Sequence, residues 1–315
     1  LVIKKIDNHY EFILNGNLIT QAPFEVFEGE DIRIGSISQN LFVRDITHSI
    51  TVSESEGFSS DILKSFGKNH ALLIGLDKEL FYGDDGEVYL KDDLTKPVID
   101  MENLKEVLDN NYSFDNIWLL PNPTRVEMLE FLDRVNASLN EDDNLLIFYS
   151  GHGITVAEED NSFYWLPVDA SLSNANRVSE HDIKTKVFGF KSKHVLIVSD
   201  ACMAGGFVEP DKNKIFDERD IFSKNKKKGR IYMSAGDTEL TPDESRFTYY
   251  FMEALKDNNK QFITSEEIYH QIAEKVRIST IDERYPEGTH PLWDQLDETG
   301  HEEGSDFIFI KKNQN

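Results

Sequence analysis

The sequence contains very little cysteine: one residue, Cys202, in a chain of 315. An intramolecular disulfide is therefore excluded, and a single free thiol favours a reducing, cytoplasmic location. Any thiol chemistry has to use this residue. Taken alone, a free cysteine is more often a small buried hydrophobic side chain than a nucleophile, so its surroundings in the sequence have to decide.

Long hydrophobic runs, basic residues and paired histidines are scarce as well. No run reaches the roughly 18 apolar residues of a membrane span, and the first residues, LVIKKIDNHYEF, lack the apolar core of a signal peptide. Lys and Arg total 33 against 58 Asp and Glu, a formal net charge of −25. Such acidity excludes nucleic acid as a general partner, and it favours cationic peptides or serves solubility alone. The nine histidines show no spacing typical of a metal site.

Residues 1–66 predict a small β-rich module. Short β-like runs alternate with turn signals, and Asn15-Gly16 between the apolar runs 11–14 and 18–20 is a strong hairpin signal. No chemical motif stands in this module. We expect it either to bind a regulatory protein or to extend the packing of the main domain.

Residues 67–315 predict an α/β domain. Continuous apolar runs are typical of strands buried on both faces of a parallel sheet. The runs cover residues 71–75, 117–120, 145–149, 195–198 and 231–234. Amphipathic segments lie between them, with capping boxes at Thr124/Glu127 and Thr264/Glu267. This alternation predicts a doubly wound, mostly parallel sheet flanked by helices.

Two stretches interrupt the α/β pattern. Residues 77–97 are polar and acidic, and residues 207–230 are rich in Lys and Arg and predict a long exposed loop. A structureless loop of that length inside a domain is usually functional or disordered.

Two adjacent predicted strands end in chemically suggestive sequences. The run 145–149 leads into Ser150-Gly-His152-Gly153, and the run 195–198 leads into Ser-Asp200-Ala-Cys202. Active sites of parallel sheets form beyond the carboxyl ends of the strands. There an imidazole raises the thiolate fraction of a thiol and later protonates the leaving amine. The sequence therefore predicts Cys202 as nucleophile and His152 as base, with the N–H groups of Gly153 and Cys202 as an oxyanion hole.

The segments 148–153 (Phe-Tyr-Ser-Gly-His-Gly) and 199–205 (Ser-Asp-Ala-Cys-Met-Ala-Gly) resemble the two signature blocks of the caspase, metacaspase and bacterial orthocaspase family. Caspases place the histidine about 50 residues before the cysteine, and here the separation is 50. The resemblance covers about residues 69–311. It implies a caspase-like fold, a cysteine endopeptidase, self-cleavage within 207–230, and a role in a bacterial defence or programmed-death pathway.

The cysteine block departs from the family pattern, since it reads Asp-Ala-Cys-Met-Ala-Gly where metacaspases commonly have Asp-Ser-Cys-His-Ser-Gly, which leaves the subfamily open. A CHAT, clostripain or gingipain type protease would keep the same His/Cys pair and differ in its substrate. A catalytically inactive caspase-like scaffold that binds partners through the β-rich module is the alternative from another class. Labelling with a thiol-reactive peptide electrophile would separate enzyme from scaffold.

Substrate preference depends on the charge of the pocket for P1, the residue before the scissile bond. Arg or Lys at P1 needs a carboxylate in this S1 pocket, whereas Asp needs an arginine. Asp200 and Ser150 each lie two residues before the predicted nucleophile and base, and Asp100 begins a helix. The resemblance implies that all three line an acidic S1 pocket, although a carboxylate at a strand end or helix start also occurs without one. No arginine stands near either block, so we expect cleavage after Arg or Lys.

The chemistry itself requires no cofactor, but the resemblance raises calcium, which many metacaspases need. Asp169, Asp182 and Glu209 lie near the expected place of such a site. A solvated acidic surface is the competing interpretation, so the metal stays undecided.

Overall fold

The computed structural model describes residues 65–156, 162–201, 221–236, 245–282 and 286–312, together with the backbone of five short strands before residue 36. The chain divides into two compact units, residues 1–57 and 58–315. In the first unit, β1 (Val2–Ile6), β2 (His9–Leu14) and β3 (Asn17–Ile19) form an antiparallel sheet, and β4 (Glu25–Val26) pairs with β5 (Ile34–Gly35). The β2–β3 pairing is that of the predicted hairpin.

The second unit is built on a six-stranded sheet in the order β17-β15-β14-β10-β6-β9. Its strands are β6 (Asn69–Gly75), β9 (Asn116–Pro121), β10 (Asn144–Ser150), β14 (His194–Asp200), β15 (Gly229–Ser234) and β17 (Leu292–Gln295). All pairings are parallel except that of the edge strand β17. Every residue of β6, β10 and β14 is buried, which explains their uninterrupted apolar runs. The predicted α/β class is confirmed.

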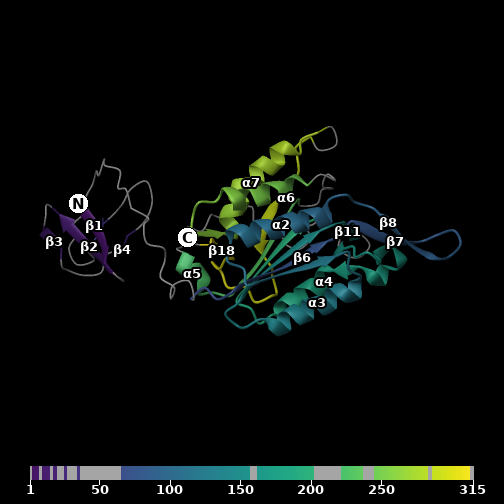
Figure 1. Cartoon of the computed structure of the whole chain (residues 1–315), viewed down its shortest axis with the longest axis horizontal. Coiled ribbons are helices and arrows are strands. Elements are labelled where there is room, and N and C mark those ends of the chain that lie inside the picture. Colours follow the sequence, from purple (N-terminus) through teal and green to yellow (C-terminus); the bar gives the residue numbers. More distant parts are fainter. Residues whose placement is uncertain are drawn as a thin grey trace. The chain divides into compact units, whose positions relative to one another are not determined.

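Helices cover both faces of this sheet (Figure 1). On one face lie α2 (Pro97–Asn111), α6 (Arg246–Asp257) and α7 (Ser265–Ser279), and on the other lie α3 (Arg125–Ser138) and α4 (Glu180–Phe188). Successive residues of β10 alternate between the two cores: Leu146 and Phe148 join one, and Leu145 and Ile147 join the other. The predicted capping boxes at the starts of α3 and α7 are confirmed.

The polar stretch 77–97 is not a plain loop. It contains the antiparallel hairpin β7 (Lys78–Tyr82) and β8 (Val88–Asp92). A second small sheet comprises β11 (Gly153–Val156), β12 (Ser162–Trp165) and β13 (Val178–Ser179), and β16 (Phe262–Thr264) pairs with β18 (Ile308–Ile310). Within the described ranges, no helix is long and apolar enough to cross a membrane.

The richness in Lys and Arg predicted an exposed loop over residues 207–230, but the end of this range forms regular structure. The predicted loop gives way to α5 (Ile221–Asn225), where the buried Lys224 Nζ lies 2.7 Å from Oε2 of Glu266. Arg230 is also buried, in β15, and its guanidinium donates to four backbone carbonyls. Basic residues suggested solvent exposure, but here the Lys224 ammonium bonds a buried carboxylate and the terminal nitrogens of Arg230 bond backbone carbonyls. Residues 207–220 lie outside the described residues.

Phe66, the last residue of the predicted N-terminal module, packs against the second unit. Phe66 is buried, its ring stacks on Phe262 at 4.7 Å, and its carbonyl accepts a hydrogen bond from Asn144. Residue 66 therefore packs as part of the second unit.

Candidate active site

The strands β10 and β14 are neighbours, and their last residues, Ser150 and Asp200, pair in register. The N–H of Gly151 donates to the carbonyl oxygen of Asp200 at 3.2 Å, so the two segments remain hydrogen-bonded where β10 and β14 end. His152 follows one strand, and the buried Ala201 follows the other. Cys202 itself lies outside the described residues.

The backbone of His152 is held by the strands around it. Its carbonyl oxygen accepts from the hydroxyl of Tyr149 at 2.7 Å and from the N–H of Leu166 at 3.1 Å. The Tyr149 ring stacks on Trp165 with centroids 4.3 Å apart, and the Trp165 indole donates to Oγ of Ser199. One aromatic pair therefore braces both the histidine loop and the end of β14.

The N–H of Gly153 points away from its neighbouring strand. The Leu166–His152 bond makes residues 152 and 166 a hydrogen-bonded pair of the antiparallel β11–β12 ladder. Gly153 pairs with Trp165 in the next position, and such pairs alternate between bonded and non-bonded. Its N–H is therefore directed off the β11 edge, where it can serve a ligand.

Asp200 and Asp100 come together behind this edge. Asp200 is buried, and the hydroxyls of Thr248 and Ser245 bond its carboxylate. Burial raises the pKa of Asp200. Burial, and then the charge of Asp200, raise the pKa of Asp100 to about 6. Within the described ranges, neither carboxylate forms an ion pair with a Lys, Arg or His side chain. Ser150 lies directly beside Asp200 in the sheet.

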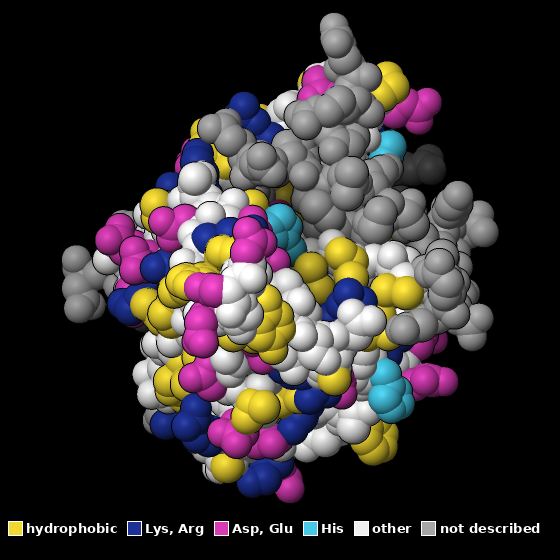
Figure 2. All heavy atoms as spheres, turned by 90° about the vertical axis from the view of Figure 1, so that its right-hand side faces the viewer, with side chains coloured by type: hydrophobic (Ala, Val, Ile, Leu, Met, Phe, Trp, Pro, Cys, Tyr) yellow, Lys and Arg dark blue, Asp and Glu magenta, His cyan; other side chains and the backbone are white. Residues whose placement is uncertain are grey.

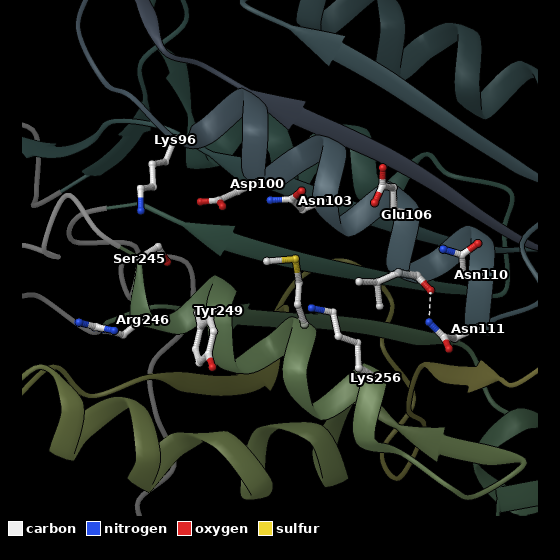
Figure 3. Close-up of a pocket in the computed structure, with 12 residues that line it drawn as sticks. Lys96, Asp100, Asn103, Glu106, Asn110, Asn111, Ser245, Arg246, Tyr249 and Lys256 are labelled. Carbon is white, nitrogen blue, oxygen red and sulfur yellow. Dashed lines mark hydrogen bonds between the residues drawn. The ribbon is translucent and has the colours of Figure 1, made fainter.

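A groove of about 660 Å³ runs from Asp100 between α2 and α6. Figure 3 shows Asp100 on the α2 wall and Ser245, Arg246 and Tyr249 on the opposite wall. Lys96 and Arg246 are exposed at the groove, whereas Asp100 is half-buried and Asp200 is buried. No arginine stands near either block in the sequence, but Arg246, 44 residues beyond Cys202, lines this groove.

The site lies toward the end of the molecule that faces the viewer in Figure 2. Acidic and basic side chains are interspersed on the described part of that face. The net charge of −25 is therefore not gathered there as one patch.

Comparison with known proteins agrees with this geometry. The profile of the caspase domain family, peptidase family C14, matches residues 68–295. The chain belongs to the caspase domain family. Its members are cysteine-type peptidases, so the substrates are proteins or peptides. A search of curated proteins found no significant match. The crystal structure of protein GSU0716 from Geobacter sulfurreducens is similar in fold, with 17% identity, a TM-score of 0.52 and coverage of 76% of this chain and 99% of that chain.

Two of the three calcium candidates of this caspase domain are engaged by Arg125. Asp182 closes the capping box of α4, and its Oδ2 lies 3.1 Å from the guanidinium of Arg125. Asp169 accepts from the backbone N–H of the same Arg125. A cation placed between the two carboxylates would meet this arginine. Within the described ranges, no three His, Cys, Asp or Glu side chains gather as a metal group, and Glu209 lies outside those ranges.

The sequence pattern missed several residues at the caspase site. Nε2 of His152 lies 2.5 Å from Oδ2 of Asp93, 59 residues earlier in the chain. Ser245 and Thr248 reach Asp200 from the start of α6. None of these stands in a chemical motif. The one available signal was the acidic stretch 77–97, which follows the first strand and so begins at the active edge of the sheet.

Proposed function

We propose that the chain is an active cysteine endopeptidase in which Cys202 is the nucleophile and His152 the base. The observation that carries this proposal is the in-register pairing of Ser150 with Asp200. In the sequence, each residue of the proposed dyad follows this pair by two positions, so we expect both side chains at the same edge of the sheet. Membership of the caspase domain family supports the same chemistry.

In the proposed mechanism, the imidazole takes the proton of the Cys202 thiol, and the thiolate attacks the scissile carbonyl carbon. The carbonyl oxygen becomes an oxyanion, which the N–H groups of Gly153 and Cys202 stabilise. The imidazolium then protonates the leaving amine as the peptide bond breaks. Water, deprotonated by the same imidazole, hydrolyses the remaining thioester and restores the thiol.

We further propose that the enzyme prefers Arg or Lys at P1. Asp200 and Asp100 are desolvated carboxylates whose raised pKa values reflect the cost of burying negative charge. An incoming guanidinium or ammonium group would compensate that charge. Ser150, at the end of β10, adds a small side chain beside Asp200 and leaves room for a long basic residue.

Arg246 favours a second candidate, cleavage after an acidic residue, because it lines the same groove. Its exposure argues for a role at the rim, since the buried groups of the site are carboxylates. Fluorogenic peptides that differ only in Arg, Lys or Asp at P1 test the two directly. Faster cleavage of the Asp peptide would reject the basic preference and leave the dyad proposal standing.

The basic preference should depend on pH through Asp100. Because its pKa is raised to about 6, this carboxyl becomes neutral as the pH falls through that value, and its attraction for a cationic P1 side chain is lost. We expect kcat/KM for an Arg peptide to fall toward about pH 5 more steeply in the wild type than in Asp100→Asn. Profiles of the two proteins that stay parallel between about pH 5 and 8 would contradict this role.

Self-cleavage is proposed for the basic segment that precedes α5. A peptide has to be extended to enter a protease site, which the buried ion pair of Lys224 opposes within α5 itself. We therefore expect cuts after Lys212, Lys214 or Arg219, and none after Lys224. N-terminal sequencing of fragments checks this, with Cys202→Ala as the uncleaved control. An intact wild-type chain, or identical fragments from both proteins, would contradict it.

Residues 1–66 are proposed to regulate the enzyme by binding a partner protein, and a defence or cell-death pathway is the proposed setting. The regulatory role rests on the distinct composition of that module and its lack of chemical motifs, and the pathway rests on the family resemblance. A truncated protein designed to test this should begin after Gly57, because the buried Phe66 belongs to the peptidase core.

A further inference from the structure

The proposed dyad assigns no role to Asp93, the residue in contact with the histidine ring. Oδ2 of Asp93 lies 2.5 Å from Nε2 of His152. The two side chains are 28% and 44% exposed, so the contact is partly shielded from water. They come from different elements, since Asp93 directly follows β8 and His152 follows β10. A hydrogen bond this short to a carboxylate orients the ring strongly.

The backbone fixes Asp93 independently of the histidine. The N–H of Asp93 donates to the carbonyl oxygen of Asp77 at 2.8 Å, which closes the base of the β7–β8 hairpin. The N–H of Asp77 in turn donates to the side chain of Asn122, whose φ of 49° places it in the left-handed region. The N–H of Leu80 donates to the carbonyl oxygen of Val168 and ties the hairpin to the domain. Asp93 is therefore presented by a braced hairpin.

The two other carboxylates near the base of the hairpin, Glu79 and Asp92, lie close to lysines. Glu79 lies 2.7 Å from Lys91, and its pKa is lowered mainly by that hydrogen bond and only slightly by the charge of His152. Asp92 is 85% exposed and lies 3.9 Å from Lys78. Among the described residues, the carboxylate that the structure places in hydrogen-bond contact with the imidazole is that of Asp93.

We propose that Asp93 is the positioning residue of His152. Its carboxylate accepts the Nε2–H, which fixes the tautomer and leaves the lone pair on Nδ1. Nδ1 then takes the thiol proton and later gives it to the leaving amine, while Asp93 stays ionised and stabilises the imidazolium. This inference rests on the proposed function, because it takes Cys202 as the group that His152 serves.

Kinetics of Asp93→Ala and Asp93→Asn test the inference, with Asp92→Asn as the matched control one residue away. With an Arg peptide, we expect kcat to fall about tenfold or more in both Asp93 variants and KM to stay near the wild-type value. Asp92→Asn should keep both parameters, and thermal unfolding should show all proteins folded. A kcat equal to that of Asp92→Asn would overturn the proposal. An increased kcat would also overturn it, because the contact would then restrain the histidine.

A second readout does not depend on activity. In the Cys202→Ala background, ¹⁵N NMR of the neutral His152 ring should show the Nε2-protonated tautomer with Asp93 present and a mixture of tautomers in Asp93→Ala. An unchanged tautomer would overturn the proposal. If the wild type cleaves no peptide, the proposed function fails, and the tautomer experiment still decides whether Asp93 sets the state of the ring.

Discussion

Cys202→Ala and His152→Ala are each expected to reduce peptide cleavage by about 10⁴-fold or more. Cys202 is the chain's only cysteine, so its loss removes every thiol nucleophile. Without His152, the thiol loses the group that accepts its proton and later protonates the leaving amine. The measurement is the rate of cleavage of fluorogenic Arg and Lys peptides at equal enzyme concentration.

Thermal unfolding is the control for these two variants. The side chain of His152 is 44% exposed, and the hydrogen bonds that hold its loop use its carbonyl oxygen, which the substitution keeps. The unfolding temperature of His152→Ala should therefore stay close to that of the wild type. A Cys202→Ala protein that cleaves at near wild-type rate would refute the proposed mechanism.

Asp200→Ala should cost about 2 kcal/mol or more in kcat/KM for Arg and Lys peptides, roughly a 30-fold loss. Asp200 is the buried carboxylate of the proposed S1 pocket, and its removal leaves a bound cation without its main partner. The comparison of kcat/KM for basic and neutral P1 residues measures the effect, because only the basic substrates depend on the charge.

Two further variants isolate the charge of Asp200. Asp200→Asn keeps a side chain that can bond Ser245 and Thr248, so a loss equal to that of alanine identifies charge as the cause. Glu106→Gln removes a carboxylate that lines the groove of Asp100 farther along α2 and should leave kcat/KM unchanged. Equal losses for Glu106→Gln and Asp200→Asn would mean that the groove acts through its overall charge alone.

The parts of the fold that follow local rules were predictable. The apolar runs of β6, β10 and β14 have the length and continuity of strands covered on both faces, and all three are buried. The capping boxes of α3 and α7 lie where the spacing of Thr and Glu placed them. The meeting of Ser150 and Asp200 follows from the parallel sheet, since carboxyl ends of adjacent strands share one edge.

Other features depend on contacts between distant residues. The Asp93–His152 contact spans 59 residues and requires a hairpin inside a stretch that reads as acidic loop. The buried pair of Lys224 with Glu266 spans 42 residues, so the sequence around either residue does not indicate its partner. Arg246 comes to the groove because α6 packs beside α2. From composition alone, such residues are predicted to be solvent-exposed charges, and their partners are identified only in the folded structure.

Labelling of Cys202 by a peptide electrophile tests the central claim most directly. The intact mass of the wild type should gain one adduct rapidly with an Arg peptide and much more slowly with the matched Asp peptide. His152→Ala should lose this acceleration, and Cys202→Ala should gain no adduct. Labelling of the wild type no faster than that of His152→Ala would contradict an activated nucleophile and would make the domain a caspase-like scaffold.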